Sequence, residues 1–109
     1  MRKLSKSTTF REHARFALDL RLIVRTATRI YGRTRDISES GLGATVPEDL
    51  SLGDMMELEF ELPEAPEPIT LIARVSYRHG FHYGFRFVSP TSRQIQQIRR
   101  STRSLPVIR

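Results

Sequence analysis

The residues best suited to chemistry are a polar pair, Asp36 and Ser38, followed by Gly41. Side chains alternate along a strand, so an Asp and a Ser two positions apart share one of its faces. A glycine three residues later permits a positive φ or the close approach of a ligand to the backbone. Upstream, Arg11 and Arg15 add two guanidinium groups, which bind phosphate or the O6/N7 edge of guanine bidentately. Together these residues predict a site for an anionic ligand that carries guanine.

Neither half of this pattern is specific by itself. The Arg-x-x-x-Arg spacing occurs six times, as chance would give in a chain where 16 of the 18 basic residues are Arg. The Asp-x-Ser-x-x-Gly pattern occurs once, and alone it is typical of a turn at a strand end. The pair at Arg11 and Arg15 stands out because it precedes the first predicted strand, on a segment that is not committed to the core.

Charge is unevenly distributed along the 109 residues, whose net charge is +6. Ten basic residues lie in 1–35, eight acids and no base in 48–67, and eight arginines and no acid in 68–109. The basic excess indicates an anionic partner without naming it. The chain has no Cys, and no apolar run reaches the length of a signal peptide or a membrane span. We therefore expect a cytoplasmic protein without membrane insertion.

Apolar and polar residues alternate in six segments, which is the pattern of half-buried strands. The predicted strands span residues 16–24, 28–37, 42–46, 56–62, 69–77 and 83–87. The apolar positions of the fifth strand run up to Tyr77. In the sixth, Tyr83, Phe85 and Phe87 share the apolar face and Arg86 lies on the other. Six short strands at regular spacing predict an all-β fold, either a small antiparallel barrel or a sandwich.

The pattern changes at Ser89-Pro90, where Ser is a preferred N-cap and Pro suits the first helical position. Apolar residues then recur three to four positions apart, so we expect a C-terminal helix at about 90–103 that packs by one stripe. These elements predict one barrel domain over residues 10–104. A flexible basic segment at 1–9 would precede it, and a tail at 105–109 would follow it.

The order of these elements and motifs resembles a PilZ domain, a bacterial receptor domain for cyclic di-GMP. The resemblance rests on the arginine pair, the Asp-x-Ser-x-x-Gly motif and the late strand Tyr-Gly-Phe-Arg-Phe at 83–87, and it covers nearly the whole chain. It implies a six-stranded antiparallel barrel with a C-terminal α-helix. That expectation agrees with the strand pattern.

The resemblance also implies a role for each motif residue. Arg11 and Arg15 would grip the phosphates and guanine edges of cyclic di-GMP, and would order the N-terminal segment over the ligand. Asp36 and Ser38 would meet a guanine base, with Gly41 close beneath it. A carboxylate accepts hydrogen bonds from guanine N1–H and N2–H, which suits Asp36 to this role.

Other positions refine this prediction. Arg86 points away from the apolar face of its strand, and some family members use an arginine here. Phe10 stands where many members have a further arginine that favours a stacked, two-molecule form of the ligand. We therefore expect a single bound cyclic dinucleotide, or weaker binding. Arg33 and Arg35 are interpreted as solvated strand positions, and the alternative is that either supplements the site.

Catalysis finds little support in the sequence. The three His residues lack a Cys or carboxylate cluster at metal-ligand spacing, and no glycine loop is built to cradle phosphates. We therefore expect neither an enzyme nor a metal or other cofactor.

The leading hypothesis is a cyclic di-GMP receptor that orders its arginine segment on binding and relays the signal to a protein target. Such a target would belong to flagellar motility, to biofilm or exopolysaccharide secretion, or to regulation. Two alternatives remain open: a PilZ-like protein-interaction module without ligand, and a small basic β-barrel that binds nucleic acid. The acidic stretch 48–67 and the placement of most aromatic residues on core faces weigh against nucleic acid.

Overall fold

The structure of the chain, a computed structural model, describes residues 13–65 and 67–108. The predicted flexible segment 1–9, together with Phe10 and Arg11, lies outside the described residues. The described strands and helix, in chain order, are β1 (Arg15–Ala17), β2 (Arg21–Arg25), β3 (Arg29–Ile37), β4 (Gly41–Thr45), β5 (Met55–Phe60), β6 (Ile69–His79), β7 (His82–Phe87), α1 (Ser92–Thr102) and β8 (Val107–Ile108).

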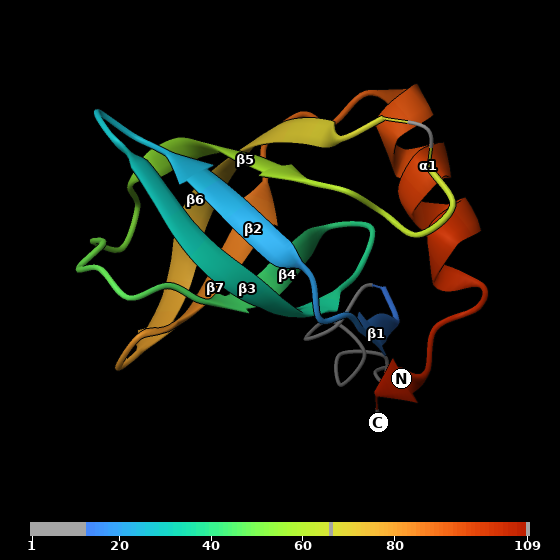
Figure 1. Cartoon of the computed structure of the whole chain (residues 1–109), viewed down its shortest axis with the longest axis horizontal. Coiled ribbons are helices and arrows are strands. Elements are labelled where there is room, and N and C mark those ends of the chain that lie inside the picture. The colour runs from blue at the N-terminus through green and yellow to red at the C-terminus, as the bar shows by residue number, and fades with distance from the viewer. Residues whose placement is uncertain (1–12, 66, 109) are drawn as a thin grey trace, which may run out of the picture.

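Six antiparallel strands close into a barrel in the order β2-β5-β6-β7-β4-β3, and β3 pairs with β2 to complete it. Figure 1 shows β2 and β3 at the front of the barrel, with α1 at one end. The two short strands β1 and β8 extend the sheet beyond β3. The predicted fold class, a six-stranded antiparallel barrel with a C-terminal helix, is confirmed.

The barrel interior is filled by the apolar positions of the alternating segments. Leu22 and Val24 of β2, Leu58 of β5 and Tyr83 of β7 are completely buried, and Phe85 of β7 is nearly so. Burying one such side chain stabilises the fold by roughly 1.5–3 kcal/mol. The alternation read from the sequence therefore identifies the faces that hold the barrel together.

The predicted strand 16–24 is two strands in the structure, and Thr34 of β3 explains the break. Its buried hydroxyl donates to the carbonyl of Leu18 at 2.6 Å and accepts from the amide of Leu20 at 2.8 Å. A side chain thus replaces part of the backbone pairing with β3 over the residues that separate β1 from β2. As a result, β1 pairs with the last residues of β3, and β2 pairs with the first.

The helix begins at Ser92, two residues after Pro90, the predicted first helical position. Thr91 is the N-cap: its side chain accepts from the amide of Gln94, whose own side chain accepts from the Thr91 amide. Ser89 instead takes a positive φ of 49°, which places it in the turn before the helix. The predicted N-cap at Ser89 is therefore wrong. Ile98 is the fully buried residue of the helix stripe.

The end of the chain is more ordered than the sequence indicated. Residues 105–109, predicted as a tail, include β8, and its Val107 and Ile108 pair with Phe16 and Arg15 of β1. No helix within the described part of the chain is long and apolar enough to cross a membrane.

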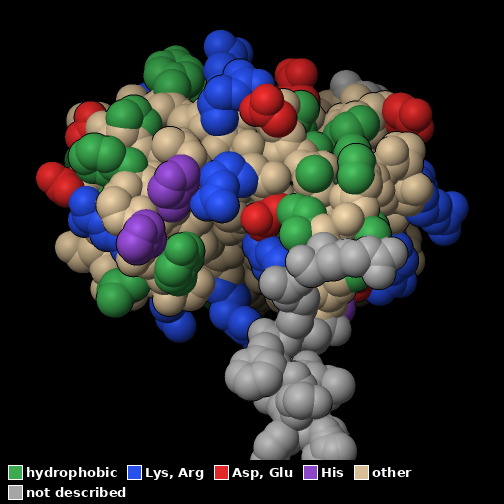
Figure 2. Space-filling view, turned by 90° about the horizontal axis from the view of Figure 1, so that it is seen from below, with side chains coloured by type: hydrophobic (Ala, Val, Ile, Leu, Met, Phe, Trp, Pro, Cys, Tyr) green, Lys and Arg blue, Asp and Glu red, His purple; other side chains and the backbone are tan. Residues whose placement is uncertain are grey.

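The surface is rich in basic groups. Seen from below, the molecule presents Lys and Arg side chains beside His and isolated hydrophobic groups, with fewer acids between them (Figure 2). Among the large exposed apolar side chains are three aromatic ones, Tyr31, Tyr77 and Phe81. Most aromatic residues are expected on core faces, and these three are the exceptions among the described residues.

Candidate functional site

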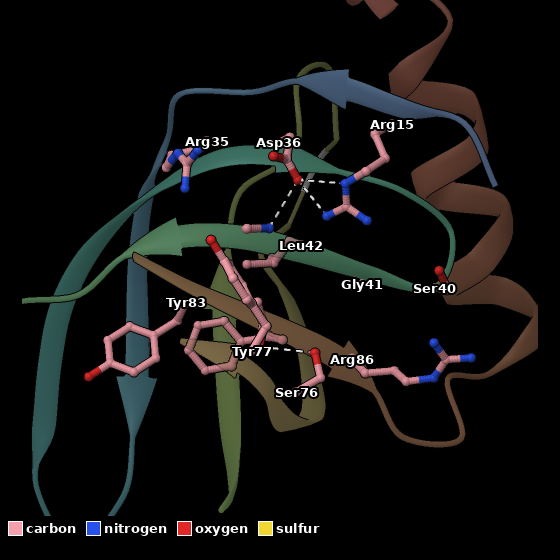
Figure 3. A pocket seen from close by; sticks show the side chains of 13 residues that line it. Arg15, Arg35, Asp36, Ser40, Gly41, Leu42, Ser76, Tyr77, Tyr83 and Arg86 are labelled. Carbon is pink, nitrogen blue, oxygen red and sulfur yellow. Dashed lines mark hydrogen bonds and ion pairs between the residues drawn. The ribbon is translucent and has the colours of Figure 1, made fainter. Parts of the chain in front are cut away.

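A pocket of about 290 Å³ lies on the outside of the barrel, over the ends of β3, β4, β6 and β7. In Figure 3 the Arg15–Asp36 pair lies on one side of this pocket, and Ser76 and Tyr77 lie on the other. Arg35, Gly41 and Arg86 also contribute to its wall. The pocket thus brings together residues that are far apart in the sequence, from Arg15 to Arg86.

Asp36 is the centre of the polar side of the pocket. Its Oδ1 atom accepts from Arg15 Nε at 2.9 Å, from Arg15 Nη2 at 2.5 Å and from the amide of Gly43 at 3.2 Å. The pairing of β1 with β3 sets Ala17 opposite Asp36, which brings Arg15 within reach. Among the described residues, none donates a hydrogen bond to the second carboxylate oxygen, Oδ2. The carboxylate is therefore held firmly by one oxygen and retains acceptor capacity on the other.

Two glycines of β4 shape this side of the pocket in different ways. A Cβ atom added to Gly41 would lie 2.2 Å from the carbonyl oxygen of Phe85, so this glycine lets the backbone of β7 approach closely. A Cβ added to Gly43 would lie 3.1 Å from the Asp36 carboxylate oxygens, so Gly43 leaves room for that side chain. The sequence singled out Gly41 but not Gly43.

Ser38 has a different place from the one that its spacing suggested. β3 ends at Ile37, and Ser38 lies buried in the turn to β4, where its amide donates to the Gly41 carbonyl at 2.8 Å. Its hydroxyl accepts from the amide of Ser40 at 3.1 Å. Ser40, rather than Ser38, lines the pocket. The structure thus gives Ser38 a role in positioning the turn, and its contact with a ligand stays a prediction.

The aromatic side of the pocket arises from a bulge in the pairing of β6 with β7. Val75 pairs with Phe85 and Tyr77 with Gly84, so Ser76 is the extra residue. The bulge turns Tyr77 outward, with its ring against Gly84 and half of its surface exposed (51%). The prediction that Tyr77 continues the apolar face of the strand is wrong, because the bulge interrupts the alternation. An exposed tyrosine ring in a pocket is a platform on which a planar base stacks.

Two more arginines carry positive charge at the rim. Arg35 is the extra residue of a second bulge, between β3 and β4, and its Nη1 lies 3.3 Å from His82 Nδ1. Arg86 is opposite Gly41 in the pairing of β4 with β7 and is exposed, as the alternation of its strand predicted. Three arginines and one carboxylate therefore line the pocket, which favours an anionic ligand.

An ion pair fastens the turn beside the pocket to the helix. Glu39 accepts from Arg99 Nε at 2.8 Å and from Arg99 Nη2 at 2.9 Å. These hydrogen bonds lower the pKa of Glu39 below its ordinary value, although partial burial works in the opposite direction. His13 Nε2 lies 3.9 Å from the same carboxylate. The turn that follows β3 is thus tied both to α1 and to the segment that leads into β1.

The described residues include no group of three or more His, Asp or Glu side chains arranged to hold a metal ion. What the pocket offers is a carboxylate acceptor, several guanidinium donors and an aromatic ring. Such a set binds a phosphate-bearing ligand with planar bases. Of the predicted site residues, the structure brings together Arg15, Asp36, Gly41 and Arg86, while Arg11 lies outside the described part.

Comparisons with solved structures support the same fold. The PilZ domain of YcgR from Escherichia coli, solved with c-di-GMP, is 19% identical, with a TM-score of 0.72, and the match covers 87% of this chain and 90% of that one. The PilZ domain of CeSA from a cellulose-synthesizing bacterium is 20% identical, with a TM-score of 0.64 and coverages of 81% and 93%. The inhibitor of motility MotI/DgrA from Bacillus subtilis is 16% identical, with a TM-score of 0.70, and this chain spans about half of it (coverages of 86% and 52%). No curated protein matches the chain.

The family itself follows from the sequence match. The family model of the PilZ domain matches residues 9–104, which is most of the chain and includes all six strands of the barrel and the helix. The chain is a member of the PilZ domain family.

Proposed function

We propose that this protein is a receptor that binds cyclic di-GMP in the pocket beside Asp36. The observation that carries the proposal is the pairing of Arg15 with Asp36 on the pocket wall, since these are the residues that the family resemblance assigns to the ligand. The PilZ domain of YcgR, whose fold this chain shares, was solved with c-di-GMP.

Each element of the pocket has a part in binding. Asp36 Oδ2 accepts from the N1–H and N2–H donors of a guanine, while Oδ1 stays bonded to Arg15 and to the Gly43 amide. Arg15 has further N–H donors for a phosphate or for the O6/N7 edge. Arg35 and Arg86 add charge for the second phosphate, and the Tyr77 ring stacks on a base.

The binding event also has a route to the rest of the chain. Arg15 lies on β1, which pairs with β3 on one side and with the C-terminal β8 on the other. A ligand that engages Arg15 therefore stabilises β1, and with it the segment that carries Arg11. The newly ordered surface would be read by a protein target. MotI/DgrA is described as an inhibitor of motility, which supports a target in motility. In this role the protein acts in the cytoplasm without catalysis and without a cofactor.

Isothermal titration calorimetry tests the proposal. Cyclic di-GMP should release or absorb heat and bind with one ligand per chain, as expected from Phe10, whereas cyclic di-AMP and GTP should not bind measurably at the same concentrations. Arg15→Ala and Asp36→Ala should each abolish the signal. The matched controls are Arg33→Ala and Asp19→Ala, which break an exposed ion pair of the same kind outside the pocket and should leave binding unchanged.

Circular dichroism of all four variants confirms that they are folded before their binding is compared. A folded wild-type protein that gives no heat with cyclic di-GMP would reject the receptor role and leave the protein-interaction module without ligand. Loss of binding in the Arg33→Ala variant together with tighter binding in the Asp19→Ala variant would mean that the ligand responds to overall charge rather than to this pocket.

A further inference from the structure

A second basic surface lies on the outer face of β2 and β3. The outward side chains of β3 are Arg29, Tyr31, Arg33 and Arg35, at every second position, and all are exposed. β2 adds Arg21, which is also exposed and lies opposite Arg33 in the strand pairing. We call these five residues the arginine face. It follows the two strands at the front of the barrel in Figure 1.

The charges of this face are only partly balanced within the chain. The pairing sets Arg21 opposite Arg33 and Arg25 opposite Arg29, and like charges directly opposite each other destabilise a sheet. Asp19 compensates Arg33, and Glu57 and Glu59 compensate Arg25. Within the described residues, neither Arg21 nor Arg29 has a carboxylate within ion-pair distance. An anion on this face would relieve the repulsion that remains.

The arginine face also carries an aromatic ring over a hollow. A shallow hollow of about 820 Å³ is lined by Arg21, Tyr31, Arg33 and Arg35, together with Pro47 and with Asp19, whose carboxylate is paired with Arg33. Tyr31 is 49% exposed, and the guanidinium carbon of Arg21 lies 5.7 Å from the centre of its ring. An acidic peptide needs only the charges of such a surface. A ring exposed among guanidinium groups adds a stacking partner, which a nucleobase uses and a carboxylate does not.

The two objections that the sequence raised against nucleic acid apply less to this face. Of the acids that adjoin it, Glu57 and Glu59 are engaged by Arg25 and Asp19 by Arg33, whereas the exposed Glu61 lies beside Arg21. Tyr31 is on the surface rather than in the core. From this geometry we propose that the arginine face binds single-stranded nucleic acid, with arginines on the phosphates and Tyr31 stacked on a base.

Fluorescence anisotropy of a labelled single strand of about 12 nucleotides, within the usual site size of such surfaces, tests the proposal on the full chain. The key variants are Tyr31→Ala, Tyr31→Phe and the double change Arg21→Gln with Arg29→Gln. Tyr31→Ala should weaken binding at least about fivefold, and Tyr31→Phe should restore it because the ring is kept. The double variant should weaken binding and make the slope of log K against log salt shallower by about 1.4, because two phosphate contacts are lost.

Matched control variants lose the same overall charge, or the same number of aromatic rings, as the test variants. Arg93→Gln with Arg103→Gln removes the same charge from exposed positions in and just after α1, and Phe81→Ala removes an equally exposed ring from the β6–β7 turn. Both should change the affinity less than about twofold. Any of three results would overturn the proposal: an equal loss of affinity in the control double variant, wild-type affinity in Tyr31→Ala, or no anisotropy change with the wild-type protein.

Two further binding experiments identify the ligand of the arginine face. A labelled peptide of about 12 glutamates should bind much more weakly than the oligonucleotide, and equal affinity would overturn the proposal in favour of an acidic protein. Arg15→Ala and Asp36→Ala should leave oligonucleotide binding intact, since those residues lie outside the arginine face. Loss of binding in these two variants would place the strand in the other pocket and refute the proposal. Arg35 borders both hollows, so it is left unchanged in every variant.

Discussion

Arg15 donates from both Nε and Nη2 to one and the same oxygen of Asp36, Oδ1, at 2.9 and 2.5 Å. The arrangement differs from a two-oxygen fork, in which an arginine occupies both carboxylate oxygens. The Gly43 amide adds a third donor to that oxygen, so the carboxylate is oriented before any ligand arrives. The exposed fraction of the side chain is 25% for Arg15 and 19% for Asp36, so solvent screens this pair less than a surface ion pair.

A double-mutant cycle measures how much this pair contributes to stability. Urea unfolding of Arg15→Ala, Asp36→Ala and the double variant should give a coupling energy of about 1–2 kcal/mol, between the values for exposed and buried pairs. The same cycle on Arg33 and Asp19, whose exposed fractions are 59% and 80%, should give less than about 0.5 kcal/mol. Equal coupling in the two cycles would show that burial does not strengthen the Arg15–Asp36 pair.

The two glycines of β4 separate stability from binding. Gly41→Ala should lower the free energy of unfolding by about 2 kcal/mol or more, because the new Cβ would meet the backbone of Phe85, which cannot move without breaking the β4–β7 pairing. Gly43→Ala should cost less than about 1 kcal/mol, because the Asp36 carboxylate needs to shift by only a few tenths of an ångström and keeps its bonds to Arg15, but the shift should weaken cyclic di-GMP binding. Urea unfolding and calorimetry on both variants check this. Equal losses of unfolding free energy in the two variants would contradict the different roles assigned to Gly41 and Gly43.

Much of the barrel follows from local patterns in the sequence. Alternation over single strands identified the buried faces of β2, β5, β6 and β7, since a half-buried strand exposes one side and buries the other. The Asp36 motif and the arginine pair located one wall of the pocket. These features depend on residues close together in the chain, which is why the sequence shows them.

The features that the sequence missed depend on pairings between distant segments. Tyr77 is turned outward by a bulge whose position is set by its partner β7, not by the residues of β6. Thr34 breaks a predicted strand because its hydroxyl meets the backbone on either side of residue 19. Ser38 lies in a turn in which its amide donates to Gly41, and Gly41 in turn packs against β7, a strand distant in the sequence. The spacing of Asp36 and Ser38 is compatible both with a shared strand face and with a turn at Ser38, so the pattern alone does not distinguish these two structures.

The Glu39–Arg99 ion pair should make stability depend on pH. Hydrogen bonds from Arg99 lower the pKa of Glu39 in the folded protein below its ordinary value of 4.5. The stabilisation is therefore complete above the pKa of the unfolded chain and is lost as the pH falls through the lower, folded pKa. Wild type should exceed Glu39→Gln in unfolding free energy at pH 7, and the gap should narrow as the pH falls below about 5 and on through the lowered, folded pKa of Glu39. His13, which also faces Glu39, is present in both proteins.

The control for this pH effect is Glu61→Gln. Glu61 is an exposed acid that forms no ion pair with another described residue. Its unfolding free energy should follow that of the wild type across the range. Urea midpoints measured at five or so pH values are sufficient. A gap for Glu39→Gln that stays constant down to pH 3 would mean that the side chain acts by packing rather than by charge.

Tyr77 provides the sharpest test of how the pocket holds a base. Tyr77→Ala should weaken cyclic di-GMP binding by about five- to a hundredfold, the effect of losing one stacked base, while Tyr77→Phe should bind as well as the wild type because the ring is retained. Gly84→Ala, whose Cβ would lie 3.1 Å from the Tyr77 ring, should weaken binding by displacing the ring without removing it. Tyr31→Ala, an equally exposed tyrosine outside the pocket, is the control and should have no effect on calorimetric titrations. If Tyr77→Ala binds as tightly as the wild type, the base does not lie on this ring, and the Arg15–Asp36 side of the pocket holds the ligand alone.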